Sequence, residues 1–188
     1  MAKVTFSSKV QISDFTLTST EPKYTNQSWT GARIIRSTGI QYYTGQFTLN
    51  FNQADRLEVM KFIAQYSQGA SFQFPLGHLG TYPGSYTGAI SVGAAVARGI
   101  SQFTTASTQA LEIGTLIQFT NHKKLYRVIA NTGTQITVFP SLQASIQLGE
   151  NVFYDSLVIE MQFDDDNDFA LPITNYATMT FKATEVVR

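Results

Sequence analysis

The sequence predicts a mainly β protein with one helix (α+β), in which a small OB-like β-barrel is inserted into a discontinuous first domain. Three observations lead to this prediction: uncharged polar and aromatic residues dominate, several runs alternate between polar and apolar residues, and one segment repeats at helical spacing. The 188 residues include 14 Phe, 9 Tyr and 1 Trp, while only 14% are charged. Such a composition favours strands over helices.

The charge balance and the lack of cysteine exclude several classes of protein. Thirteen basic and 13 acidic residues cancel, whereas proteins that bind DNA or anionic membranes through their overall field usually carry a basic excess. With no Cys, a disulfide framework, a thiolate nucleophile and a Cys-based zinc site are excluded. No segment reaches the roughly 20 apolar residues of a membrane span, and the N-terminus lacks a signal peptide's apolar stretch. We therefore expect cytoplasmic synthesis and no membrane span.

The first third of the chain predicts strands. Residues 5–18 alternate loosely, as one or two strands would, and residues 29–35 and 40–51 are stronger β runs. Ser37-Thr38-Gly39 lies between these two runs, and Gly accepts the positive φ of a hairpin connection. One long hairpin is therefore expected from residues 29–51.

A single helix is predicted from Gln53 to Tyr66. Asn52 can cap its start, and Gly69 can end it. Apolar residues recur near helical spacing and are expected to form its buried face: Ala54, Leu57, Met60, Phe62, Ile63 and Tyr66. The helix should cover the sheet made by the flanking strands.

The middle of the chain predicts a separate barrel. Residues 77–88 contain four Gly and one Pro, which marks a boundary. Five short β segments follow it: 89–92, 102–105, 115–119, 125–129 and 135–139. Five short strands in about 65 residues fit a small Greek-key barrel such as an OB-fold. We expect this inserted domain to span residues 85–150.

The last segment predicts two further strands, at residues 157–163 and 177–183. Two strands alone cannot make a core. The economical solution pairs them with the N-terminal strands, so that residues 1–84 and 151–188 form one discontinuous domain. The barrel would then be inserted at a loop tip, where insertions are well tolerated.

Few residues offer catalytic chemistry. The two His lie in predicted loops, and no His-Glu-x-x-His, Gly-x-Ser-x-Gly or P-loop pattern occurs. The segment 164–168, Asp-Asp-Asp-Asn-Asp, resembles the start of a calcium loop, but Phe169 replaces the turn Gly and Asn175 replaces the bidentate Glu. A solvated turn is favoured over a metal site. We expect no enzymatic activity, cofactor or metal.

The charge is unevenly distributed along the chain. Residues 151–188 contain seven acidic and two basic residues. If several copies assembled with this segment facing a shared channel, its charges would repel a polyanion passing through. The channel-facing candidates are Asp164, Asp165, Asp166 and Asp168. The simpler alternative is that these acids only keep a turn soluble.

One stretch resembles a module common in phage tail proteins. It runs from Gly114-Thr-Leu-Ile-Gln-Phe through Leu125-Tyr-Arg-Val and Thr134-Gln-Ile-Thr-Val-Phe-Pro-Ser-Leu to Gly149-Glu-Asn-Val. The order of predicted elements around it is similar to that of the distal tail protein of long-tailed (siphovirus) bacteriophages. In residue pattern the resemblance covers only about residues 114–152.

The resemblance implies a structural virion protein and its surroundings. A tail-tube-like β-sandwich domain would form a ring, of six copies in that family, joining the tail tube to the tip or baseplate hub and lining the DNA passage. The implied partners are other copies of the chain, the tail tube protein and the hub or tip proteins, with DNA only in transit. The implied location is the virion tail tip, after synthesis in the host cytoplasm.

Two alternatives stay open. The chain could be another minor tail protein, since similar modules occur there, or a module whose barrel binds a saccharide, such as one on the host surface, or nucleic acid. Aromatic residues on such barrels can stack on bases, although most of those here alternate as core residues do. The candidate ligand surface is Lys123, Lys124, Tyr126 and Arg127.

Overall fold

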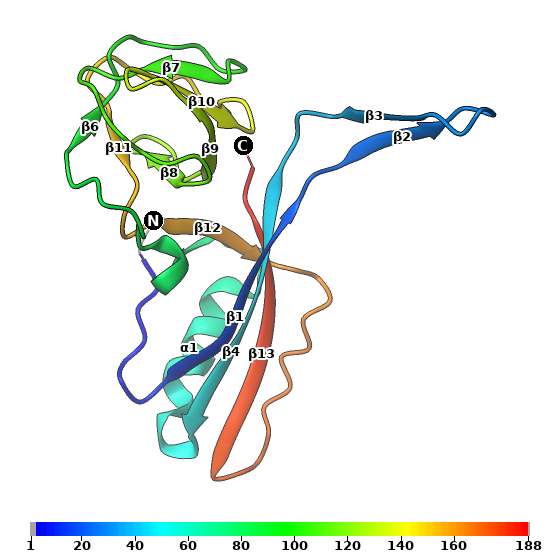
Figure 1. The fold of residues 1–188 in the computed structure, drawn as a ribbon. Coiled ribbons are helices and arrows are strands. Elements are labelled where there is room, and N and C mark those ends of the chain that lie inside the picture. Colours follow the sequence, from blue (N-terminus) through cyan, green and yellow to red (C-terminus); the bar gives the residue numbers. More distant parts are fainter. Residues whose placement is uncertain (1–2, 188) are drawn as a thin grey trace. The chain divides into compact units, whose positions relative to one another are not determined.

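The computed structural model describes residues 3–187, which form two compact units (Figure 1). Unit 1 comprises residues 3–19, 42–75 and 160–186, and unit 2 comprises residues 20–41, 76–159 and Val187. Strands dominate, as the composition predicts, and one α-helix is present, as the helical spacing of residues 53–66 predicts. The division differs from the predicted one, because residues 20–41, 76–84 and 151–159 belong with the barrel instead of with the first domain.

Unit 1 consists of one sheet and two helical elements. The strands are β1 (Gln11–Thr20), β4 (Tyr42–Asn52), β5 (Phe72–Pro75), β12 (Val158–Phe163) and β13 (Tyr176–Glu185), and the helical elements are η1 (Gln53–Asp55), a 3-10 turn, and α1 (Arg56–Tyr66). The strand order is β1-β4-β13-β12-β5. Strands from both ends of the chain thus pair: β4 and β13 run antiparallel over nine residue pairs, from Tyr176↔Asn52 to Thr184↔Thr44.

Phenylalanine rings fill the space between the sheet and α1. Phe47 of β4 stacks on Phe74 at 4.6 Å and on Phe181 at 5.5 Å between ring centroids. From the helix, Phe62 meets the edges of Phe72 and Phe163. Because all six are buried, they form a core with α1 as the facing layer, where a sandwich would place a second sheet.

The helix exists where the sequence predicts it, but its buried face is different. Val59 and Phe62 are buried, whereas Leu57 is 78% exposed and Met60 is 40% exposed. The element begins with η1, which has about three residues per turn, so spacing counted from Ala54 does not continue into α1. The side chain of Asn52 precedes η1 but makes no capping hydrogen bond.

The predicted hairpin between residues 29–35 and 40–51 does not form. The second run is β4, which pairs with β13, while the first overlaps β3 (Arg33–Ser37), which pairs with β2 (Lys23–Gln27). Strand β4 carries the buried Phe47, Leu49 and Phe51. These side chains require an apolar environment. The exposed strand β3 does not provide one, whereas β13 and α1 do.

Unit 2 contains a curled six-stranded sheet. Its strands are β6 (Ile90–Ser91), β7 (Gln102–Thr104), β8 (Leu116–Phe119), β9 (Tyr126–Asn131), β10 (Gln135–Phe139) and β11 (Asn151–Phe153), preceded by a 3-10 turn, η2 (Gly77–Gly80). The order is β6-β11-β8-β9-β10-β7. The bridge Val92↔Thr105 and the bond from Gly93 N to Thr104 O, 2.8 Å, join the two outer strands. The sheet therefore closes into a small barrel (Figure 1).

The barrel includes one strand more than predicted. An OB-fold has five strands, so this six-stranded sheet does not show the OB-like topology. The additional strand, β11, pairs with β6 and β8 and lies beyond the predicted boundary at residue 150. It is required because Val152 contributes to the buried barrel core with Ile90, Phe119 and Tyr126.

Within residues 3–187, no helix has both the length and the apolar character needed to cross a membrane.

Closure of the barrel requires glycine at position 93. A Cβ added there would lie 2.8 Å from the carbonyl carbon and oxygen of Thr105, which are backbone atoms that cannot rotate away. We predict that Gly93→Ala lowers the free energy of unfolding by about 1–3 kcal/mol, measured by urea denaturation. The control Ala94→Val adds volume at an exposed neighbour and should change it by less than about 0.5 kcal/mol. Equal stability of Gly93→Ala and the wild type would contradict this role.

Candidate functional site

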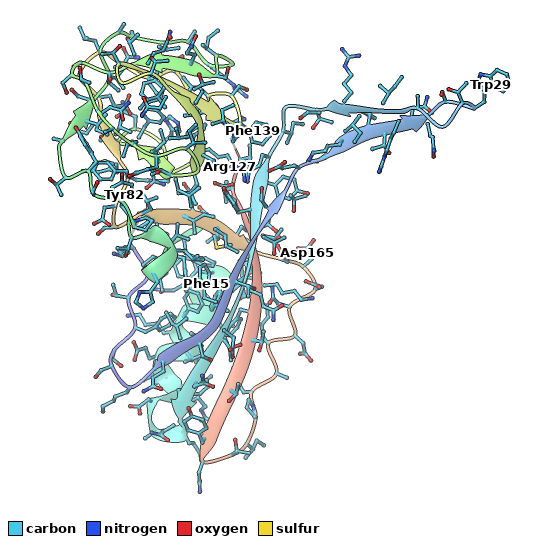
Figure 2. The ribbon with its side chains drawn as sticks, in the orientation of Figure 1. Phe15, Trp29, Tyr82, Arg127, Phe139 and Asp165 are labelled. Carbon is cyan, nitrogen blue, oxygen red and sulfur yellow. The ribbon has the colours of Figure 1, made fainter. Side chains whose placement is uncertain are left out.

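The most unusual surface of the described chain is a two-stranded hairpin, residues 22–40, which we call the arm. Its strands β2 and β3 pair only with each other, in a sheet of their own. Every residue of both strands is exposed. Trp29 is 99% exposed and lies at the far end of the arm (Figure 2).

Both faces of the arm mix apolar and basic side chains. Paired residues of an antiparallel ladder share a face, so Tyr24↔Arg36 and Asn26↔Ile34 lie on one face, and Thr25↔Ile35 and Gln27↔Arg33 lie on the other. Tyr24 is 72% exposed, Ile34 65% and Ile35 55%. The arm contains three basic residues and no acidic residue.

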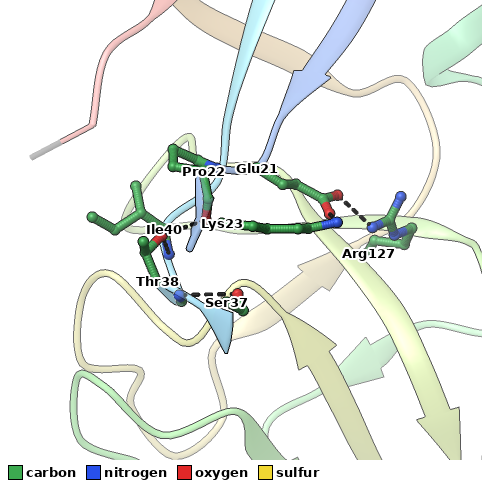
Figure 3. Close-up of polar contacts among 8 residues, drawn as sticks. Glu21, Pro22, Lys23, Ser37, Thr38, Ile40 and Arg127 are labelled. Atoms are coloured by element: carbon green, nitrogen blue, oxygen red, sulfur yellow. Dashed lines mark hydrogen bonds and ion pairs between the residues drawn. The ribbon is translucent and has the colours of Figure 1, made fainter. Parts of the chain in front are cut away.

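Polar contacts fix the base of the arm to the barrel. Glu21 accepts a hydrogen bond from Arg127 of β9, with Nη2 and Oε1 2.9 Å apart, and its other oxygen lies 3.4 Å from the ammonium of Lys23 (Figure 3). The Arg127 guanidinium also lies over the Phe139 ring at 5.9 Å from its centroid. Arg127 thus connects Glu21, the residue before the arm, to the barrel strands β9 and β10.

The other end of the arm is held by a local turn. The Thr38 hydroxyl donates to the carbonyl of Pro22 at 2.8 Å, and the same hydroxyl oxygen accepts from the N–H of Ile40 (Figure 3). Gly39 has φ +74°, a conformation that favours glycine. The two ends of the arm are therefore joined to each other at its base.

A buried lysine holds the residue that follows the arm. The Lys124 ammonium donates to the Gln41 carbonyl at 2.9 Å and to the Gln41 side-chain oxygen at 3.0 Å. Lys124 is 6% exposed and Gln41 2%. Because a buried ammonium needs hydrogen-bond partners to offset its lost hydration, Lys124 and Gln41 depend on each other.

The four residues predicted as a ligand surface are not brought together on one exposed face. Lys124 and Arg127 hold the arm, and Tyr126 is fully buried, with its hydroxyl 2.8 Å from His122 Nε2 and accepting from Gln143 N at 2.9 Å. Lys123 lies over the exposed ring of Phe153, 5.8 Å from its centroid. Burial lowers the pKa of His122, which stacks on Phe119.

The four predicted channel-facing acids lie in the loop between β12 and β13. Residues 164–175 of this connection, which we call the acidic loop, contain four Asp and no basic residue. Asp166 pairs with Lys182 of β13, and Asp164 accepts from Thr184 at 2.6 Å. The hydrogen bond from Lys182 lowers the pKa of Asp166. Asp165 and Asp168 remain exposed (Figure 2 labels Asp165).

A cleft of about 700 Å³ in unit 2 is a second candidate site. Tyr82 and Tyr154 line it, in edge contact at 5.0 Å, together with Glu112. The Tyr82 hydroxyl donates to the Glu112 carboxylate. Partial burial and this bond raise the pKa of Tyr82, and the same bond lowers that of Glu112. The cleft offers aromatic faces beside a carboxylate, as ligand pockets commonly do.

Within residues 3–187, no three His, Cys, Asp or Glu side chains gather in a way that could hold a metal ion.

Sequence reasoning missed both the arm and the tyrosine cleft. For the arm, the available signal was the polar and basic residues on both faces of residues 23–37, since a strand packed on a core has one apolar face. The cleft had a weaker signal, namely Tyr82 and Tyr86 in the Gly-rich boundary segment.

Comparison of the sequence with protein-family models finds no match, and a search of curated proteins finds none either.

The buried Lys124 ammonium should stabilise the base of the arm. Lys124→Met keeps the unbranched shape of the side chain but removes the ammonium group and with it both hydrogen bonds to Gln41. We predict a loss of about 1–3 kcal/mol in the free energy of unfolding and faster amide hydrogen exchange across residues 37–41. The control Lys123→Met should change stability by less than about 0.5 kcal/mol. If Lys124→Met leaves both measurements unchanged, the anchoring role is wrong.

Proposed function

We propose that this chain is a structural, non-enzymatic virion protein of a bacteriophage tail. Copies of it assemble into a ring, of six as the family resemblance implies, which connects the tail tube to the tip or baseplate hub. Its partners are other copies, the tail tube protein and the hub or tip proteins, and DNA passes through it in transit. Its location is the tail tip.

The observation that carries this proposal is the exposed arm. An isolated two-stranded hairpin is marginally stable at best in water, yet this arm exposes Tyr24, Trp29, Ile34 and Ile35. Its base is fixed by Glu21, Arg127 and the Thr38 turn. A fixed base with an uncovered apolar tip is the arrangement of an element that completes its packing on another molecule.

The sheet of unit 1 offers a second surface for assembly. Strand β1, ten residues long, lies at one edge of the sheet. An edge strand presents unpaired backbone groups that invite a further strand, and so little charge along the chain leaves few repulsive side chains to prevent it. Strand addition between copies would extend the sheet around a ring.

Assembly tests the proposal directly. We predict that the full chain, alone or with its tail tube and hub proteins, forms rings visible by negative-stain electron microscopy and measurable by native mass spectrometry. The double variant Trp29→Ser/Ile34→Ser should weaken assembly by about thirtyfold, since an interface tryptophan often contributes about 2 kcal/mol or more.

The control variant is Ile113→Ser/Leu148→Ser, which removes two exposed apolar side chains, each 69% exposed, outside the arm. It should assemble as the wild type does. A chain that stays monomeric even with its tail partners would overturn the proposed function, while equal assembly of the arm variant would remove its principal support.

A second candidate function, saccharide binding, is favoured by the tyrosine cleft. Tyr82 and Tyr154 provide aromatic faces, and Glu112 provides a hydrogen-bond acceptor for hydroxyl groups. The half-buried Tyr86 packs on Tyr154 at 5.8 Å and supports that ring. Both functions could belong to one chain, because the arm and the cleft use different residues.

Ligand titration distinguishes the second candidate. We predict that the full chain binds oligosaccharides with an affinity that changes little between 50 and 200 mM salt, and that Tyr154→Ala weakens binding about tenfold or more. Tyr176→Ala, which removes a 58% exposed ring from unit 1, serves as the control. Binding of oligonucleotides that falls steeply with salt would indicate a nucleic-acid site instead, and absence of any binding would reject the candidate.

A further inference from the structure

Two segments of the chain are oppositely charged, and they also carry the two most exposed large apolar side chains among residues 3–187. The arm holds Lys23, Arg33 and Arg36 with no acidic residue, and the acidic loop holds four Asp with no basic residue. Trp29 in the arm is 99% exposed, and Ile173 in the acidic loop is 92% exposed. Each segment therefore combines a charge of one sign with an uncovered apolar side chain.

Some of these charges already have partners, and others do not. Lys23 pairs with Glu21, and Asp166 pairs with Lys182. Among the residues that the structure describes, Arg33, Arg36, Asp165 and Asp168 form no ion pair and no side-chain hydrogen bond. Each segment thus keeps two charges available to another molecule.

The symmetry of a ring requires two different surfaces on each copy, and these two segments can provide them. A cyclic assembly of more than two copies uses a heterologous interface, in which two different patches of the chain meet head to tail. The arm and the acidic loop are two such patches, with complementary charge. Paired charges would set the register and speed encounter, while Trp29 and Ile173 would supply apolar contact.

We propose that the arm of one copy docks on the acidic loop of the neighbouring copy in the assembly. Because Arg33 and Arg36 lie on opposite faces of the arm, the acidic loop lies along the edge of β3, where both can reach Asp165 and Asp168, and the apolar arm residues cover Ile173. This inference rests on the proposed ring and names the surface on which the arm packs. It assigns the acidic loop to contact between subunits, in place of the channel lining that the sequence predicts.

Charge reversal in mixed copies tests the docking. One variant, Arg33→Glu/Arg36→Glu, has acidic residues in both the arm and the acidic loop. The other, Asp165→Lys/Asp168→Lys, has basic residues in both segments. Each alone should assemble about tenfold or more weakly than the wild type in 0.1 M salt, because like charges would meet. Their equimolar mixture should restore rings, with the two variants alternating, as native mass spectrometry can show.

The control and the salt dependence separate this effect from net charge. Arg56→Glu/Arg98→Glu changes the net charge by the same amount at two exposed positions outside both segments, and it should assemble normally. Raising the salt to 0.5 M should reduce the difference in assembly strength between each charge-reversal variant and the wild type, because exposed charges are then strongly screened.

The outcomes distinguish the docking from the ring itself. If the wild type forms rings but both variants assemble equally well, the docking is wrong and the ring stands. If the variants fail singly and the mixture does not recover, the arm has a different partner, in the same copy or in another protein, and the docking is again wrong. If the wild type never assembles with its tail partners, both proposals fail.

Discussion

The pairing of β4 with β13 is the constraint on which the rest of the structure depends. It joins strands separated by more than 120 residues in the chain, over nine residue pairs. The paired strands bring Phe47 and Phe181 into contact, and those rings form the floor on which Phe62 of α1 packs. The chain between β4 and β13 therefore contains segments that lie outside this sheet, and the longest of them forms the barrel.

The arm depends on a different kind of interaction. Its strands bury none of their residues, so polar contacts at its base define where it begins and ends. Lys124 and Arg127 provide the barrel side of these contacts, and Gln41 and Glu21 provide the arm side. A buried ammonium and a partly buried guanidinium are costly without partners, which makes the barrel and the arm base mutually dependent.

Local patterns predicted the elements better than their partners. The strand at residues 40–51, the helix at 53–66 and the last two strands occur close to their predicted positions, because alternation and helical spacing are visible within ten or fifteen residues. The partner of the strand at residues 29–35 was wrong, since pairing depends on which distant strand offers an apolar face. The barrel was predicted without β11, because the predicted boundary at residue 150 falls one residue before this strand begins.

The candidate sites were less predictable still, since they depend on contacts between distant residues. Lys124 meets Gln41 across 83 positions and Arg127 meets Glu21 across 106, so the basic residues that suggest a ligand surface in the sequence are structural in the fold. The acidic segment is a loop between two strands, and two of its four acids bond to β13.

The position of β13 has a consequence for how the chain is made. The barrel strands β6 to β11 all precede it, and their contacts close within residues 90–153, so the barrel can fold while synthesis continues, as domains generally do. The unit 1 sheet lacks its central strand until β13 has emerged from the ribosome. The slow, non-local pairing of β4 with β13 therefore follows the synthesis of the whole barrel.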